Sequence, residues 1–178
     1  GLLAGRFAIA DLLLVALMVA LRRPFPRGRP LLVAIGMGGI GYVGQAACFF
    51  SALHYASSGL VALLLYVYPT LVVILSAIFF RERITGAKLV LLAASFAGLA
   101  LMLGGGTGTA TGFLLGLAAA GIYSVYIIVG ARELSGTDAP ATTTVVCLSG
   151  GATLAIASLF LDARLPGTTW GWAALVAI

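Results

Sequence analysis

A single carboxylate lies within the apolar stretches of this sequence, and it is the side chain there best suited to bind a cation or carry a proton. Asp11 follows about nine residues of the first stretch, so a helix with a rise of ~1.5 Å per residue would place it ~14 Å deep in a membrane. A carboxylate at that depth is costly unless it is paired, protonated or hydrated. Two interpretations stay open. Asp11 either faces a cavity, where it binds a cationic substrate or carries a proton, or it pairs with a group on a helix outside this sequence.

Three further apolar stretches carry aromatic hydroxyls and other polar groups at a similar expected depth. Residues three or four apart share one face of a helix. The sets with this spacing are Tyr42 with Gln45, Tyr66 with Pro69 and Thr70, and Tyr123 with Tyr126. They are either core residues bonded to backbone carbonyls or the lining of a mid-membrane pocket for an amphipathic substrate. With Asp11 they make up the predicted substrate cavity, whereas Tyr68 is expected to point elsewhere and to serve packing.

Two residues at the ends of the stretches are candidates for gating or coupling. His54 lies at the expected outer mouth, where it is either a solvated turn residue or a group that responds to pH. Glu82 lies between Arg81 and Arg83 at the expected inner end. These three charges form either a local cluster that fixes the depth of a helix or an inner-gate ion pair that breaks during a transport cycle.

The composition predicts that these residues belong to a membrane protein. The chain is 62% hydrophobic and 8% charged, whereas soluble domains carry about 25% charged residues. The net charge of +5 does not indicate a nucleic-acid partner, because the basic residues lie in short breaks between apolar stretches and not on one face. With one histidine no metal site is expected, and no nucleotide-binding loop is visible. We therefore predict no catalytic residues, no cofactor and no metal.

The apolar stretches predict an all-α, polytopic bundle of transmembrane helices. We expect six complete spans, at about 2–21, 31–53, 58–80, 87–104, 112–131 and 141–161, each near the ~20 residues that cross a bilayer. A seventh, from residue 170, is cut short, so we expect the chain to be a fragment. Pro69 should break the third span, because it removes a backbone hydrogen bond. Small residues recur every four positions at Gly112, Gly116, Ala120 and Ser124, a spacing that lets helices approach closely.

The basic residues predict an orientation. Eight of them occupy alternate breaks: Arg22, Arg23, Arg27, Arg29, Arg81, Arg83, Lys88 and Arg132. Because short loops rich in Lys and Arg stay in the cytoplasm, that side is expected to be cytoplasmic and the residue-1 end to face outward. Nine of the ten basic residues are arginine, which suggests a GC-rich bacterial source and therefore an inner membrane.

A series of motifs follows in order along the first half of the chain. Its positions are Ala52, Leu53, Tyr55, Pro69, Glu82, Arg83, Thr85 and Gly98. The series resembles the EamA-type repeat of the drug/metabolite transporter superfamily, and 112–132 is similar to the opening helix of that family's second repeat. The resemblance covers most of 5–132. Two positions depart from the family pattern: Leu91 stands where the family often has glycine, and Asp11 stands where the residue is usually apolar.

The resemblance implies a ten-helix transporter made of two five-helix repeats of inverted topology. On that register 1–106 holds most of the first repeat, without its first helix, and 107–178 holds the start of the second. The resemblance also implies export of small metabolites, amino acids or drugs. We therefore predict a multi-pass secondary transporter, not an enzyme, that works by alternating access through a central cavity. Its expected partners are a small-molecule substrate and the lipid bilayer, and one of the two interpretations of Asp11 adds a coupling proton.

Two other functions stay open at this point. A membrane-embedded enzyme would need a further cluster of acids or histidines in helices outside this sequence, and a structural membrane subunit would need no polar cavity. The substrate, the direction of transport, the driving ion and the oligomeric state do not follow from the sequence.

Overall fold

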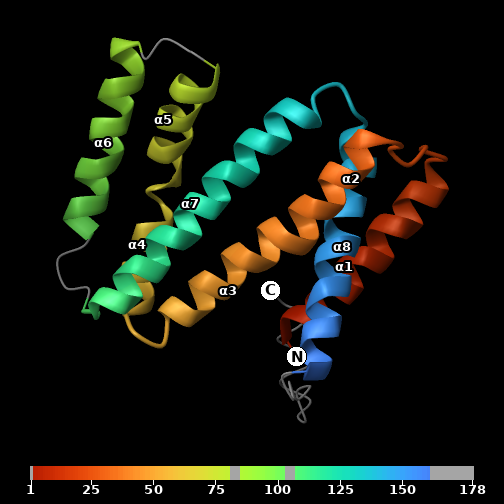
Figure 1. The fold of residues 1–178 in the computed structure, drawn as a ribbon, viewed down its shortest axis with the longest axis horizontal. Helices are drawn as coiled ribbons and strands as arrows, with labels where there is room; N and C mark the ends of the chain where they lie inside the picture. Colours follow the sequence, from red (N-terminus) through yellow and green to blue (C-terminus); the bar gives the residue numbers. More distant parts are fainter. Residues whose placement is uncertain (1, 81–84, 103–106, 161–178) are drawn as a thin grey trace. The chain divides into compact units, whose positions relative to one another are not determined.

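A computed structural model describes residues 2–80, 85–102 and 107–160, and these are helical apart from short turns (Figure 1). Within those ranges there is no strand, and two residues, Ala56 and Gly108, form an isolated bridge. The all-α prediction is therefore confirmed. The chain divides into two compact units, Gly1–Val43 with Glu133–Ile178, and Gly44–Arg132.

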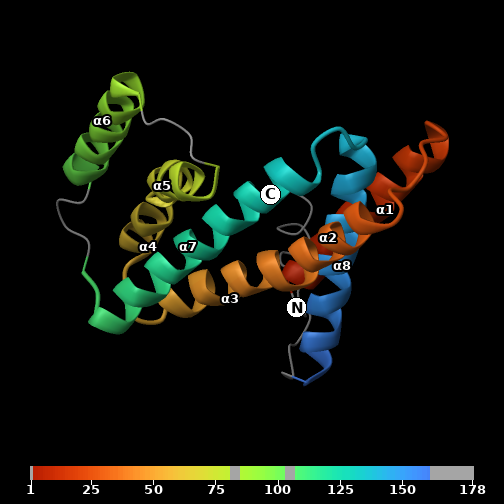
Figure 2. The same cartoon turned by 45° about the horizontal axis from the view of Figure 1, so that its top comes forward.

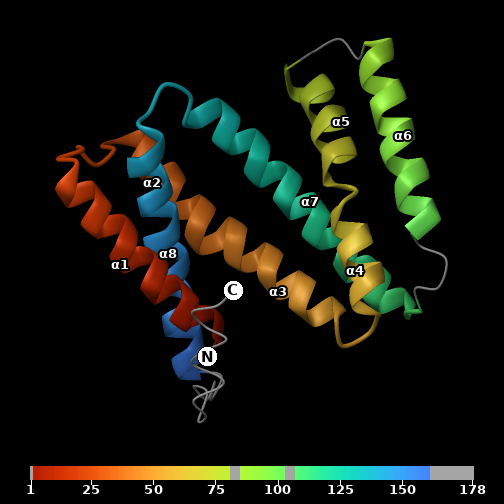
Figure 3. The ribbon, with the colours of Figure 1, turned by 180° about the vertical axis from the view of Figure 1, so that it is seen from behind.

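The first unit is built around α8 (Ala139–Phe160), which packs against α1 (Leu2–Ala20), α2 (Arg29–Gly36) and η1 (Met37–Tyr42). Figure 3 shows the end of α1 and the starts of α2 and α8 at the same end of this unit. Its core is made of buried apolar side chains on all these helices, namely Met18, Ala34, Met37, Ala141 and Val145. Thr144, which is fully buried, donates a hydrogen bond to the carbonyl oxygen of Pro140 at 2.8 Å, so its hydroxyl is satisfied within α8.

The η1 segment is a π-helix, and three of its six residues are glycine. The backbone of η1 comes very close to α8 there. A Cβ added at Gly38 would lie 2.0 Å from the carbonyl oxygen of Val146 and 2.1 Å from the hydroxyl oxygen of Ser149. The glycines of η1 therefore lower its helix propensity but let its backbone approach α8 closely. Turns of π-helix inside α-helices often mark functional segments.

The second unit holds α3 (Val43–Ala52), α4 (Ser58–Leu65), α5 (Tyr68–Phe80), α6 (Gly86–Met102) and α7 (Ala110–Glu133). Figure 2 shows α7 between α3 and α4. Added Cβ atoms at Gly112 and Gly116 would lie 2.8 Å from Ala56 and 2.7 Å from Leu64. All four members of the expected small-residue stripe on α7 are buried, so its predicted role in close packing is confirmed.

The third apolar stretch is broken, as the proline predicts. Helix α4 ends at Leu65 and α5 begins at Tyr68, one residue before Pro69. An unbroken helix would need an N–H on Pro69 to bond the carbonyl of Leu65, and the proline ring would clash with that carbonyl. The chain instead leaves the helix at Tyr66, whose N–H bonds the carbonyl of Ala62 at 3.1 Å, and restarts two residues later.

Four helical segments of the described chain are long and apolar enough to cross a membrane: Arg29–Ala52, Ser58–Phe80, Ala110–Glu133 and Ala139–Ala157. The apolar part of α1, Ile9–Ala20, is shorter. Side chains that cover these helices are largely apolar and exposed, as at Leu12 and Leu114, which fits a surface that faces lipid. The expected partial span from residue 170 lies outside the described residues.

Candidate functional site

Tyrosine rings from two helices of the second unit form a cluster. The rings of Tyr68 on α5 and Tyr123 on α7 meet edge to face, with centroids 4.8 Å apart. Tyr123 and Tyr126 stack at 6.0 Å with an interplanar angle of 19°. Aromatic pairs in these geometries contribute roughly 0.5–1.5 kcal/mol beyond the area that they bury. The cluster therefore holds its rings in defined orientations, with both polar hydroxyls and flat aromatic faces.

The buried hydroxyl of Ser124 on α7 links this helix to the start of α5, next to the tyrosine cluster. Ser124 is fully buried, and its hydroxyl oxygen lies 2.7 Å from the carbonyl oxygen of Ala120 and 3.2 Å from that of Tyr68. The carbonyl of Tyr68 belongs to the first turn of α5, and the hydroxyl of Ser124 gives it a donor from the neighbouring helix α7. Ser124 thus fastens the start of α5 to α7 next to the aromatic rings.

The helix break changes which tyrosine joins the cluster. Tyr66, Pro69 and Thr70 were predicted to share a face, but that spacing holds only for a continuous helix. Tyr66 falls in the break and is 63% exposed. Tyr68, which was expected to point elsewhere and serve packing, contacts Tyr123 instead. The signal that could have shown this is Pro69 itself, because its missing N–H and its clash with the carbonyl of Leu65 favour a break just before it, which shifts the helical register.

Pro69 and Thr70 are half-buried in the first turn of α5. Gln45 is half-buried on α3. With Tyr66 and the two α7 tyrosines, these residues are the predicted cavity members that lie in the second unit. Asp11 and Tyr42 lie in the first unit.

Asp11 lies on the half-buried side of α1 in the first unit. Its Oδ1 atom is buried and has no hydrogen-bond partner among the residues that the structure describes. The carboxylate is close enough to Cys147 on α8 to interact with it electrostatically. Each buried polar atom without a partner calls for an explanation, such as an ion, a water or a ligand. Tyr42 is the last residue of η1 and is also half-buried.

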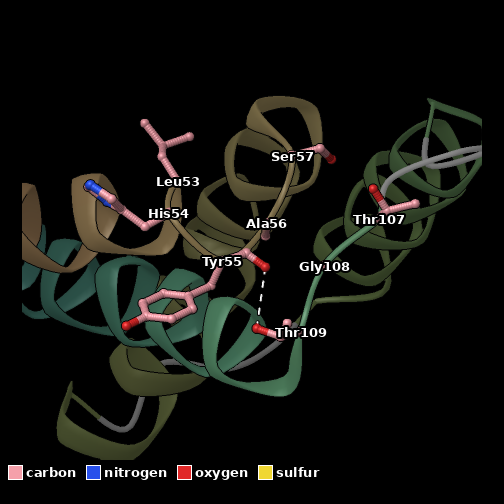
Figure 4. Close-up of a pocket in the computed structure, with 8 residues that line it drawn as sticks. All are labelled: Leu53, His54, Tyr55, Ala56, Ser57, Thr107, Gly108 and Thr109. Carbon is pink, nitrogen blue, oxygen red and sulfur yellow. Dashed lines mark hydrogen bonds between the residues drawn. The ribbon is translucent and has the colours of Figure 1, made fainter.

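His54 lines a shallow pocket of about 370 Å³ at the turn between α3 and α4 (Figure 4). Its Nδ1 atom lies 3.1 Å from the carbonyl oxygen of Phe50. The turn pairs with the segment before α7: the N–H of Ser57 bonds the carbonyl of Thr107, and the N–H of Thr109 bonds the carbonyl of Tyr55, both at 2.9 Å. His54 is exposed on the rim of this pocket. Glu82, the other gating candidate, lies in 81–84, outside the described residues.

Two ion pairs at one end of the first unit were missed by the sequence reasoning. Arg23 Nη1 lies 2.5 Å from Asp138 Oδ1, and Arg29 Nε lies 2.8 Å from Glu133 Oε2. The signal for them was available, because the breaks that hold these residues were both expected on the same side of the membrane. Within the described ranges, no group of three His, Cys, Asp or Glu residues is placed to hold a metal ion.

Comparisons with known proteins agree with an all-α membrane fold. A family model described as "EamA-like transporter family" matches residues 1–104. Three solved chains match. One of them, described as "Crystal structure of protein", has a TM-score of 0.77 and 28% sequence identity over 98% of this chain. The chain spans 63% of that protein's length. A search of curated proteins found no match at the same level.

Proposed function

We propose a transport mechanism for this chain, which belongs to the EamA-like transporter family and so to the membrane transporters of the drug/metabolite transporter superfamily. The family points to a transporter and not to an enzyme. In our proposal the whole protein is a secondary transporter that exports small metabolites, amino acids or drugs by alternating access. It has ten helices in two inverted five-helix repeats, with 1–106 in the first and 107–178 in the second. A central cavity between the repeats holds the substrate.

One observation carries the proposal: the Oδ1 atom of Asp11 is buried on the apolar helix α1 without a hydrogen-bond partner among the described residues. A carboxylate in that setting is retained against a cost of several kcal/mol. An acid that only stabilised the fold would be expected to bond a neighbouring donor. We assign Asp11 to the cavity, where it binds either a cationic substrate group or a coupling proton.

The other cavity residues supply shape and weaker polar contacts. Tyr123 and Tyr126 present stacked rings and hydroxyls, an arrangement that suits substrates with an apolar body and a few polar groups. Tyr42, Gln45, Tyr66 and Thr70 complete the proposed lining. The break at Pro69 leaves α4 and α5 as two short helices, which can change their mutual angle at lower cost than one continuous helix.

The proposed gates lie at the two ends of the pathway. His54 is the outer candidate and Glu82 the inner one. In this proposal the protein lies in a bacterial inner membrane with the residue-1 end of this chain facing outward, and the eight basic residues of the alternate breaks face the cytoplasm.

The role of Asp11 is tested by Asp11→Asn in the full-length protein reconstituted in vesicles. Counterflow screening against metabolite pools first identifies a transported substrate. We expect the wild-type rate to depend on pH or on the substrate's positive charge, and we expect Asp11→Asn to remove that dependence. Asp11→Glu, which keeps the carboxylate, should restore part of it. Transport by the Asn variant with the wild-type pH profile would take Asp11 out of the mechanism.

A further inference from the structure

A second pocket lies at the arginine-bearing end of the first unit. It has a volume of about 290 Å³ and is lined by Pro24, Phe25, Pro26, Arg27, Pro30, Thr137, Asp138 and Ala141. The loop between α1 and α2 supplies one wall, and the first turn of α8 with the residues before it supplies the other. The pocket therefore lies just past the ends of three helices, which in a membrane is the level of the lipid headgroups.

The charges around this pocket do not cancel. Of the four arginines in this loop and the start of α2, Arg23 and Arg29 are paired with Asp138 and Glu133. Arg22 and Arg27 are exposed and have no carboxylate partner within the described ranges. Arg27 lines the pocket and Arg22 does not.

The carboxylate in the pocket wall is already neutralised. Asp138 Oδ1 lies 2.5 Å from Arg23, and its Oδ2 accepts a hydrogen bond from the N–H of Ala141 at 3.3 Å, which caps α8. With Asp138 engaged in this way, the guanidinium of Arg27 is the charge that an entering ligand meets. Guanidinium groups bind phosphate through two parallel N–H···O bonds, which is a strong and directional contact.

The rest of the wall is apolar and stiff. Three of the eight lining residues are proline, and a proline ring fixes the backbone φ angle. Phe25 adds an aromatic ring that is 45% exposed. A preformed wall of this kind lowers the ordering cost of binding. It also offers little to a fully hydrated anion, whereas it suits the glycerol and first acyl carbons attached to a lipid phosphate.

We propose that this pocket binds the phosphate group of an anionic phospholipid, with Arg27 on the phosphate and Phe25 against the start of an acyl chain. The inference is independent of the transport proposal, because the pocket lies in the loop end of the first unit and uses none of the cavity residues. Basic pockets at the ends of membrane helices are a known form of lipid-headgroup site.

The test is a titration of the detergent-purified full-length protein with phosphatidylglycerol, with phosphatidylcholine and with inorganic phosphate, read by native mass spectrometry. We expect phosphatidylglycerol to bind more tightly than phosphatidylcholine. Arg27→Gln should weaken phosphatidylglycerol binding about tenfold, as expected for the loss of one bidentate charged contact, and Arg27→Lys should fall in between. The matched control is Arg22→Gln, which removes the same charge from the same loop outside the pocket and should change binding less than about twofold.

Three results would overturn the proposal. If Arg27→Gln and Arg22→Gln weaken phosphatidylglycerol binding equally, the lipid is attracted by the overall positive charge of the loop and does not occupy a specific site at Arg27. Equal binding of the two lipids, which share the phosphate and differ in the net charge of the headgroup, would show that the pocket does not select an anionic lipid. Inorganic phosphate that binds as tightly as the lipid would assign the pocket to a soluble anion. An unchanged unfolding temperature of Arg27→Gln in phosphatidylcholine confirms that the variant is folded.

Discussion

The contact between η1 and α8 predicts opposite effects for two alanine substitutions only two residues apart. A Cβ at Gly38 would lie 2.0 Å from the carbonyl oxygen of Val146, 2.1 Å from the hydroxyl oxygen of Ser149 and 2.9 Å from the carbonyl carbon of Val146. Two of those three atoms belong to the backbone, so a rotamer change cannot relieve the clash. The helices must move apart by more than an ångström, or η1 must change its winding.

The expected loss of stability can be taken from other cases in which a methyl group is inserted into a close contact. Such insertions typically destabilise by about 1–3 kcal/mol, and a clash with backbone belongs at the upper end. We expect Gly38→Ala to lower the free energy of unfolding by about 3 kcal/mol, a loss of roughly 6–12 °C in unfolding temperature for a domain of this size. At Gly36 an added Cβ meets nothing within 4 Å. Gly36→Ala should therefore be neutral or stabilising, by up to about 1 kcal/mol from helix propensity.

Thermal unfolding of both variants in the same detergent, followed by circular dichroism at the helical band, measures this difference. The wild type and Gly36→Ala should melt together or with the variant higher, and Gly38→Ala should melt well below both. If Gly38→Ala and Gly36→Ala melt at the same temperature, then η1 does not approach α8 as closely as the structure requires, and the packing of the first unit is wrong.

Three more predictions concern the other contacts. Gly116→Ala should destabilise less than Gly38→Ala, by about 1 kcal/mol, because its Cβ would meet the Leu64 side chain, whose nearest atom at 2.7 Å is a movable methyl; the same melting series checks the order. A double-mutant cycle of Arg23→Gln and Asp138→Asn should give a coupling energy of no more than about 1 kcal/mol, because the Arg23 side chain is 50% exposed to water. Added salt should reduce this coupling further. A coupling of several kcal/mol would contradict this by showing that the pair is shielded from water. Pro69→Ala should join α4 and α5 into one helix, so the unfolding temperature should stay the same or rise while transport by the reconstituted protein slows. If this variant transports at the wild-type rate, the helix break has no role in the mechanism.

The helical elements followed from the sequence because their cause is local. Each apolar stretch ends at charged residues or turn residues, so the structure has helix close to each of the six expected spans. Four of these helical segments are long and apolar enough to cross a membrane. The break before Pro69 was predictable for the same reason, since a missing N–H and a ring clash act within one turn of helix. The stripe on α7 was visible as a four-residue repeat.

Other features depended on contacts between distant segments. The exchange of Tyr66 for Tyr68 in the tyrosine cluster arises because the break shifts the helical register, which a face drawn on a continuous helix cannot represent. The π-helix of η1, in which three of the six residues are glycine, did not follow from the sequence. The ion pair between Arg23 and Asp138 joins residues 115 positions apart, so it required knowing which two loops lie together.

The account depends most on the claim that polar residues of these helices line a path open to water. The direct measurement is labelling of single cysteines placed at Tyr42, Tyr66 and Tyr123 in the full-length protein, after Cys48 and Cys147 are replaced by serine. The reagent is a charged maleimide that does not cross the membrane, and Leu12→Cys, at a 73% exposed apolar position of α1, is the lipid-facing control. The account predicts labelling of the three tyrosine positions, altered by substrate, and none at the control. Three positions that stay unlabelled with and without substrate, from both sides of the membrane, would contradict it.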